Sequence, residues 1–151
     1  MLNASDAIPG YSGFRGGHAG QVYNEAAFRH FLAVDWWRAT RMRRPLLLVL
    51  VTVRQRSGLS VKLTDATAAA LFGGLVTCVR EVDFVGWYRE GHVAAAVLAQ
   101  GNKASGDARQ LIAERIQQAL RERLLPDDAG NLRVRVVRLD GSVRKRSSNG
   151  V

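Results

Sequence analysis

The chain alternates between stretches in which apolar residues recur at helical spacing and shorter stretches that are apolar throughout. Residues 46–53 read Leu-Leu-Leu-Val-Leu-Val-Thr-Val, and this uninterrupted branched run predicts a central strand buried on both faces. Near the C-terminus, apolar residues alternate with arginines, as expected of a half-exposed strand. We expect helices over residues 24–42, 64–79 and 107–124, and strands over residues 46–53, 84–88, 93–98 and 132–138.

Residues that start and stop helices agree with these bounds. Thr64 is a suitable N-cap for the second helix, Pro45 cannot continue the first, and Pro126 with Gly130 ends the third. The expected order is helix, strand, helix, strand, strand, helix, strand. This order predicts an α+β, ferredoxin-like domain in which helices pack on an antiparallel-rich sheet.

The ends of the chain differ in composition from its middle. Residues 1–20 are rich in Gly, Ser, Ala and Asn without periodicity, which predicts a flexible N-terminal arm. Residues 140–151 contain Arg144, Lys145 and Arg146 and predict a basic flexible tail. Residues 21–139 are then one domain, large enough to bury a core.

Charge is the most unusual property of the composition. The 151 residues include 22 Lys or Arg and 13 Asp or Glu, for a formal net charge of +9. A biased use of Arg codons would produce this excess, and so would selection for an anionic partner, which is a nucleotide, a nucleic acid, an acidic protein or a membrane surface. No recognised nucleic-acid-binding signature accompanies the charge, so nucleic acid is the less favoured partner.

Several other functions are disfavoured by the residues available. Cys78 is alone and cannot form an internal disulfide, and His92 has no Cys or acidic residue spaced to complete a metal site with it. Residues 1–20 lack the apolar segment of a signal peptide, and no apolar run is long enough to span a bilayer. We therefore expect a cytoplasmic protein without a metal or another cofactor.

The middle of the chain carries the most specific pattern. Arg80-Glu81-Val82-Asp83 is an Arg-x-x-Asp sequence, and after five intervening residues a short turn, Arg89 to His92, joins two predicted strands. This layout resembles the centre of a GGDEF domain, the nucleotide-cyclase-like bacterial domain that makes cyclic di-GMP. In that family the Arg-x-x-Asp pair forms an inhibitory site that binds the product.

Weaker matches flank this segment in the family's order. Residues 22–28 resemble the opening segment of GGDEF domains, residues 41–46 resemble the end of the next helix, and Asp65 stands where the following helix begins. Ala113-Glu114-Arg115-Ile116 matches a later helix. The family's last helix has no counterpart, so the resemblance implies a GGDEF-like fold without that element.

The residues that the resemblance assigns to catalysis are missing. Family members hold Mg²⁺ with a carboxylate at the end of the first strand and an acidic residue in the turn. Thr52 and Gly91 occupy those positions here, and Arg54 follows where a second acid is expected. Because neither Thr52 nor Gly91 offers a negative ligand, we expect no cyclase activity and no bound Mg²⁺.

The resemblance implies a receptor that binds cyclic di-GMP through Arg80, Asp83 and Arg115 and signals to a partner protein. Arg115 often acts from a neighbouring subunit in the family, which implies a homodimer, and the family context is biofilm or exopolysaccharide regulation. Helical spacing places Arg115 inside or at the edge of an apolar arc that includes Leu111.

Two interpretations of the site remain open. Arg80 and Asp83 also fit a structural ion pair at the end of a helix, which would leave a ligand-free scaffold or dimerisation module. Trp37, Trp87 and Tyr88 have the size to stack on guanine, but their spacing favours packing in the core.

Overall fold

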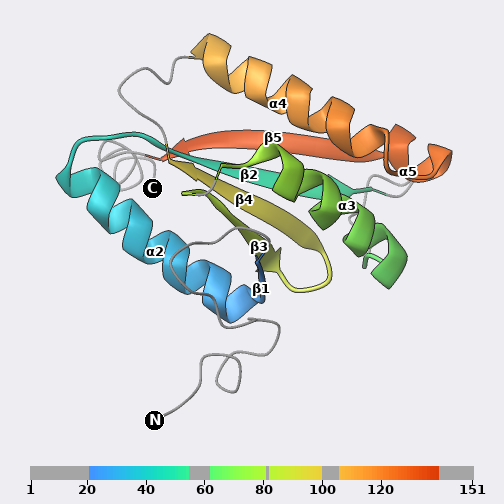
Figure 1. Cartoon of the computed structure of the whole chain (residues 1–151), viewed down its shortest axis with the longest axis horizontal. Coiled ribbons are helices and arrows are strands. Elements are labelled where there is room, and N and C mark those ends of the chain that lie inside the picture. The colour runs from blue at the N-terminus through green and yellow to red at the C-terminus, as the bar shows by residue number, and fades with distance from the viewer. Residues whose placement is uncertain (1–20, 55–61, 81, 100–105, 140–151) are drawn as a thin grey trace, which may run out of the picture.

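The computed structural model describes residues 21–54, 62–80, 82–99 and 106–139, which form a mixed sheet covered by helices (Figure 1). The strands follow the order β1-β3-β4-β2-β5; β1 is parallel to β3, and the other neighbours are antiparallel. The strands are β1 (Val22–Tyr23), β2 (Leu46–Val53), β3 (Phe84–Arg89), β4 (Val93–Ala99) and β5 (Leu132–Leu139). The helices are α2 (Glu25–Arg41), α3 (Asp65–Cys78), α4 (Gly106–Arg121) and α5 (Pro126–Gly130).

Strand β2 lies inside the sheet, as its continuous apolar run predicts. It pairs with β4 on one side and β5 on the other, and Leu46 is opposite both Ala99 and Leu139. The start of β2 therefore lies at the same end of the sheet as the last residues of β4 and β5. This end also receives the chain that enters β3, because Phe84 is opposite Val97.

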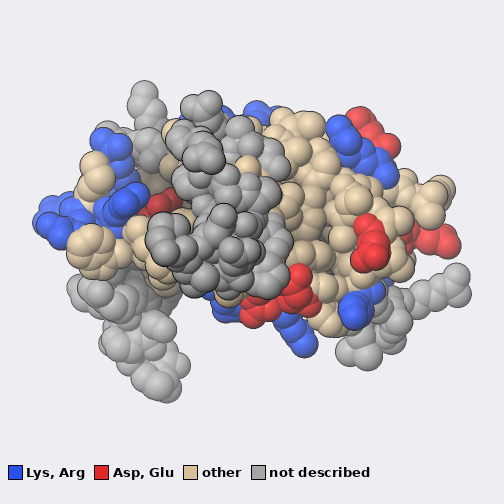
Figure 2. Space-filling view, turned by 60° about the horizontal axis from the view of Figure 1, so that its bottom comes forward, with Lys and Arg blue, Asp and Glu red and all other residues tan. Residues whose placement is uncertain are grey.

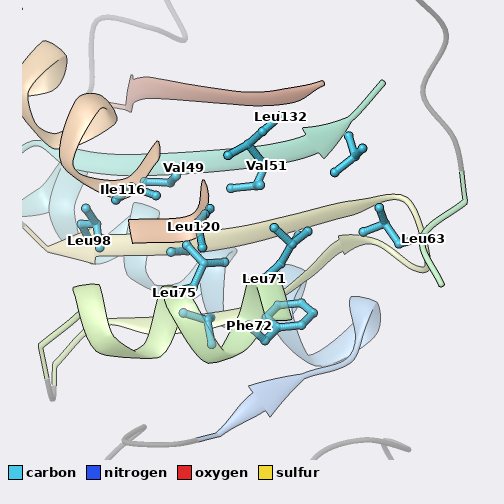
Figure 3. Packing of buried hydrophobic residues seen from close by; sticks show 14 of the residues in the cluster. Val49, Val51, Leu63, Leu71, Phe72, Leu75, Leu98, Ile116, Leu120 and Leu132 are labelled. Atoms are coloured by element: carbon cyan, nitrogen blue, oxygen red, sulfur yellow. The ribbon is translucent and has the colours of Figure 1, made fainter. Parts of the chain in front are cut away.

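Helices cover both faces of the sheet, with α2 on one and α3 and α4 on the other (Figure 1). Alternate residues of β2 point to the two faces: Val49 joins the cluster under α3 and α4, and Leu48 joins the one under α2. Figure 3 shows Leu71 and Leu75 of α3 and Ile116 and Leu120 of α4 within one cluster that packs against β2 and β4. The two apolar clusters account for the burial of β2 on both sides.

Side-chain caps fix where two helices begin. The Asn24 side chain accepts a 2.9 Å hydrogen bond from the Ala27 N–H at the start of α2. The Thr64 hydroxyl accepts one of 3.1 Å from the Thr67 N–H at the start of α3. Each cap satisfies one of the backbone donors that a helix leaves without a partner in its first turn.

The α+β architecture and the main strands and helices are confirmed, and two short elements were not expected. Strand β1 has only two residues and is too short to show alternation. Pro126, which ends the third predicted helix, also begins helix α5, because proline is favoured in the first turn of a helix. The predicted arm and tail, residues 1–20 and 140–151, lie outside the described residues.

The predicted core positions of Leu111 and Trp37 are wrong, and Arg115 lies outside the buried side of its helix. Leu111 of α4 is 63% exposed and Arg115 is also exposed, because this helix packs on the sheet through Ile116 and Leu120, which lie on another side of it. Trp37 of α2 is 60% exposed. It lies five residues after the buried Leu32, and that spacing turns it away from the sheet.

Candidate functional site

The Arg-x-x-Asp pair lies at the end of the sheet where β2 begins. Arg80 follows α3, which ends at Cys78, and Asp83 precedes β3. The Asp83 N–H donates a 3.0 Å hydrogen bond to the Arg80 carbonyl, which closes a tight turn between the two residues. The turn brings both side chains together against the last residue of β4, Ala99.

The Asp83 carboxylate is buried and fully hydrogen-bonded. The residue is 3% exposed. Its Oδ2 accepts from the Arg80 backbone N–H at 2.9 Å and from Arg80 Nε at 3.2 Å. Its Oδ1 accepts from the Ala99 N–H at 3.0 Å and from Arg80 Nη2 at 3.3 Å. Four donors occupy the acceptor positions that a carboxylate offers, so Asp83 organises this corner of the fold.

The Arg80 side chain, in contrast, is 60% exposed. Its Nε and Nη2 groups donate to Asp83, and Nη2 also donates to the carbonyl of Ala99. No donor remains on those two nitrogens, whereas Nη1 has no hydrogen-bond partner among the described residues. The guanidinium is thus held in one orientation by Asp83 and Ala99, on a side chain that is mostly exposed. An Arg fixed in this way is suited to a phosphate or a guanine edge.

The third predicted residue, Arg115, does not join this pair. It lies on the exposed side of α4, and no ion pair links it to Asp83 among the described residues. The structure therefore brings together Arg80 and Asp83 within one chain and leaves Arg115 without a bond to either of them among the described residues. Leu111, one turn earlier and also exposed, shares that side of α4.

The β3–β4 turn lies at the opposite end of the hairpin from the pair. Strand β3 has six residues, so about 20 Å separate the two ends. The His92 N–H donates to the Arg89 carbonyl at 2.9 Å, and Gly91 adopts a φ of 77°, a conformation that glycine reaches without strain. The Leu63 N–H donates to the Gly91 carbonyl at 2.7 Å, which fastens the start of the α3 segment to the turn.

Lys62 lies beside Gly91, the turn residue at whose position the resemblance places a metal ligand. A Cβ built on Gly91 would lie 3.5 Å from Cε of Lys62 and 3.7 Å from its Cγ. The side chain of Lys62 therefore lies over this residue of the turn. No group of three or more His, Cys, Asp or Glu side chains in the described part of the chain is arranged to hold a metal ion. No local pattern in the sequence predicts this contact between Lys62 and Gly91.

Glu90, which carries the one carboxylate of the turn, is hydrogen-bonded to the start of α2. Glu90 Oε1 accepts a 3.1 Å hydrogen bond from the Glu25 N–H at the start of α2. In return, Glu25 Oε1 accepts a 2.7 Å bond from the Glu90 N–H. A helix N-terminus attracts anions, and here the Glu90 carboxylate already occupies that position.

The candidate stacking residues have different surroundings. The Trp87 ring packs edge-on against Phe72 with centroids 5.0 Å apart, and the Arg29 guanidinium lies 4.4 Å from the centre of the Tyr88 ring. Both are partly buried against the core, as their spacing predicts. Trp37 is exposed and carries the Arg41 guanidinium 4.7 Å from its ring centre.

Solved structures share this arrangement of elements. A DGC protein from Thermotoga maritima superposes with a TM-score of 0.60 at 18% identity, over 85% of this chain and 92% of its own. The GGDEF domain of DgcB from Caulobacter crescentus, solved in complex with c-di-GMP, gives 0.55 at 15% identity over 83% and 77%. PelD from Pseudomonas aeruginosa, also in complex with c-di-GMP, gives 0.52 at 17% identity over 83% and 42%.

These similarities define the fold class. The chain adopts the α+β fold of GGDEF domains, as the sequence pattern predicts. No protein-family profile matches the sequence, and no curated protein matches it. None of the helices in the described residues is both long enough and apolar enough to cross a lipid bilayer.

Proposed function

We propose that this domain is a receptor for cyclic di-GMP that does not synthesise the nucleotide. One observation carries the proposal: the exposed guanidinium of Arg80 is held in a fixed orientation by the buried carboxylate of Asp83. A pre-oriented Arg loses little freedom when it binds a phosphate or a guanine edge. The complexes of DgcB and PelD with c-di-GMP support the choice of ligand, since both share the fold.

In this proposal Arg80 contacts the ligand and Asp83 positions it. The four hydrogen bonds that Asp83 accepts leave its oxygens no vacancy, so a guanine N–H would reach them only after Arg80 moves. Arg80 offers the two N–H groups of Nη1 without any rearrangement. Asp83 remains a predicted residue of the site through its effect on Arg80.

Arg115 takes part from a second copy of the chain. It is exposed on α4, and no ion pair or hydrogen bond joins it to Arg80 or Asp83 among the described residues, so a neighbouring copy would supply it. This arrangement predicts a homodimer stabilised by ligand. The ligand-bound dimer then presents a surface to a partner protein in the cytoplasm.

The residues in and around the β3–β4 turn support the absence of cyclic di-GMP synthesis. Joining two GTP molecules requires divalent ions near the triphosphate, held by carboxylates. Thr52 and Gly91 supply none, and the Lys62 side chain lies over Gly91. A lysine ammonium near this position repels a divalent cation.

A second function, a ligand-free scaffold or dimerisation module, is favoured by one observation. The pair satisfies its own hydrogen bonds almost completely and links α3, β3 and β4, as a purely structural ion pair would. Under that function, a change at Arg80 lowers stability and has no effect on a nucleotide.

Fluorescence anisotropy with labelled cyclic di-GMP separates the two functions. We expect Arg80→Ala and Arg115→Ala each to weaken binding at least tenfold, because each removes a charged contact with the ligand. Arg133→Ala removes an exposed Arg at the other end of the sheet and serves as the matched control. Equal affinity in all four proteins would contradict the proposed site.

A further inference from the structure

A basic and apolar surface surrounds the C-terminal end of α2, far from the β3–β4 turn. All of its members are exposed, and we call it the α2 patch. It consists of Trp37, Arg38, Arg41, Met42, Arg43 and Arg44. Figure 2 shows Lys and Arg side chains gathered at the left end of the molecule, the end at which α2 finishes in Figure 1.

The two large apolar side chains of the patch are mostly open to solvent. Trp37 is 60% exposed and Met42 is 59% exposed. The Arg41 guanidinium lies 4.7 Å from the centre of the Trp37 ring, so the aromatic ring and a positive charge form one unit. Exposed side chains of this size bordered by charge mark a surface that meets a partner.

The backbone holds one of these arginines in an unfavourable conformation. Arg43 has a φ of 55°, a value that favours glycine. The turn is closed by hydrogen bonds from the Arg43 N–H to the Thr40 carbonyl at 3.2 Å and from the Arg44 N–H to the Ala39 carbonyl at 2.9 Å. A glycine would fit this turn with less strain, so the position retains its charge at a cost to stability.

The patch has little negative charge to balance it. Asp35 forms an ion pair with Arg38 at 3.9 Å. No other ion pair involves a residue of the patch within the described residues. Three arginines at the tip of α2 therefore keep their charge available for an external anion.

We propose that the α2 patch docks on the surface of an anionic lipid bilayer. Arginines attract the negative headgroups, while Trp and Met at the same tip enter the interface between headgroups and acyl chains. A nucleic acid would use the charge and have no place for Met42, and one face of Trp37 is already covered by Arg41. The helix end projects outward as a tip, which a flat surface can meet. This inference does not rest on the binding of a nucleotide.

Sedimentation of the full chain with lipid vesicles tests the proposal. We expect binding to vesicles of equal parts phosphatidylglycerol and phosphatidylcholine, weaker at high salt, and none to phosphatidylcholine alone. The double variant Arg43→Gly with Arg44→Gln should bind about 25-fold more weakly, because each basic residue near an anionic surface contributes about fivefold. Its melting temperature should not fall, since glycine suits the backbone at position 43.

Matched variants distinguish an effect of the α2 patch on vesicle binding from an effect of net charge. Arg133→Gln with Arg135→Gln removes the same charge from exposed positions on β5, the first of them near the other end of the sheet, and should bind within about twofold of the wild type, because distant charges are screened. Trp37→Ala should weaken binding at low and at high salt, because an apolar contact is not screened. All of these variants keep Arg80, Asp83 and Arg115, so cyclic di-GMP binding serves as an independent measurement.

Three results would overturn the proposal. The first is a wild-type chain that does not sediment with anionic vesicles at low salt. The second is that the double variant in the α2 patch and the double variant on β5 weaken vesicle binding equally. That result would show that binding depends on net charge alone. The third is binding to a single-stranded oligonucleotide in place of vesicles, lost in the Arg43→Gly, Arg44→Gln variant, which would assign the patch to nucleic acid.

Discussion

The backbone N–H of Ala99 donates a 3.0 Å hydrogen bond to the buried carboxylate of Asp83. This bond joins the end of β4 to the residue that precedes β3, and the same carboxylate holds the side chain of Arg80. One acidic group therefore closes the hairpin and orients the proposed ligand contact. Stability and binding should respond to changes at Asp83 together, whereas a change at Arg80 should affect binding more.

Replacing the buried carboxylate should be costly. We expect Asp83→Ala to lower the free energy of unfolding by about 2–4 kcal/mol, because two backbone N–H groups and the Arg80 guanidinium lose their acceptor. Urea unfolding measures the change. Glu114→Ala, which removes an exposed carboxylate that accepts a hydrogen bond from Gln110 in the same helix, should cost about 0.5 kcal/mol or less. Similar values for the two variants would show that Asp83 does not organise this corner.

Gly86 is required by the approach of β1 to β3. A Cβ at this position would lie 2.5 Å from the carbonyl oxygen of Tyr23 and 3.0 Å from Cδ1 of Phe28. We expect Gly86→Ala to destabilise the domain by about 1–3 kcal/mol, because the nearest atom belongs to backbone.

The control for Gly86 is a glycine with more room. A Cβ at Gly73, within α3, would meet only Nη1 of Arg123, at 3.4 Å. Gly73→Ala should stabilise the domain by about 0.5–1 kcal/mol, because alanine favours a helix interior. Thermal unfolding compares the two, and a stable Gly86→Ala variant would place β1 elsewhere.

The mutual bonds of Glu25 and Glu90 should protect the start of α2. We expect Glu90→Ala to speed hydrogen exchange of the Glu25 amide, which loses its acceptor, and to cost about 1 kcal/mol as other lost helix caps do. Glu90→Gln keeps an acceptor oxygen and should stay near the wild type. If exchange at Glu25 is unchanged in Glu90→Ala, the turn is not fastened to α2 in solution.

Synthesis of cyclic di-GMP should be absent. The purified chain, incubated with GTP and Mg²⁺, should yield no product under conditions in which an active GGDEF cyclase does, because Thr52 and Gly91 provide no carboxylate for the metal. Separation of the nucleotides by chromatography measures the product. Its detection above the background of a heat-inactivated sample would refute the proposed loss of catalysis.

The sequence predicted the elements whose signals are local. The continuous apolar run of β2 and the Thr64 cap of α3 both lie within a few residues, and both are confirmed. Strand β1 is held by pairing with β3, more than sixty residues away, so it left no local pattern. Helical spacing shows which residues share a side of a helix but not how much of that side is covered, which explains the errors at Trp37 and Leu111 and the exposure of Arg115.

The candidate site also combines features that the sequence predicts with features that depend on the fold. The spacing of Arg80 and Asp83 was readable because both lie in one turn. The role of Ala99 depends on the register of β4 against β3, which places a backbone N–H beside the carboxylate. Lys62 and Gly91 are 29 residues apart in the sequence, and no local residue pattern predicts that the Lys62 side chain lies over Gly91.

The most direct test is a calorimetric titration of the purified chain with cyclic di-GMP, with GTP as the control ligand, at physiological salt. The proposed function predicts binding at micromolar strength or better, about −8 kcal/mol, and no heat with GTP. Arg80→Ala should abolish the heat while remaining folded. No heat with either nucleotide, together with an unchanged melting temperature in their presence, would contradict the receptor and favour the ligand-free scaffold.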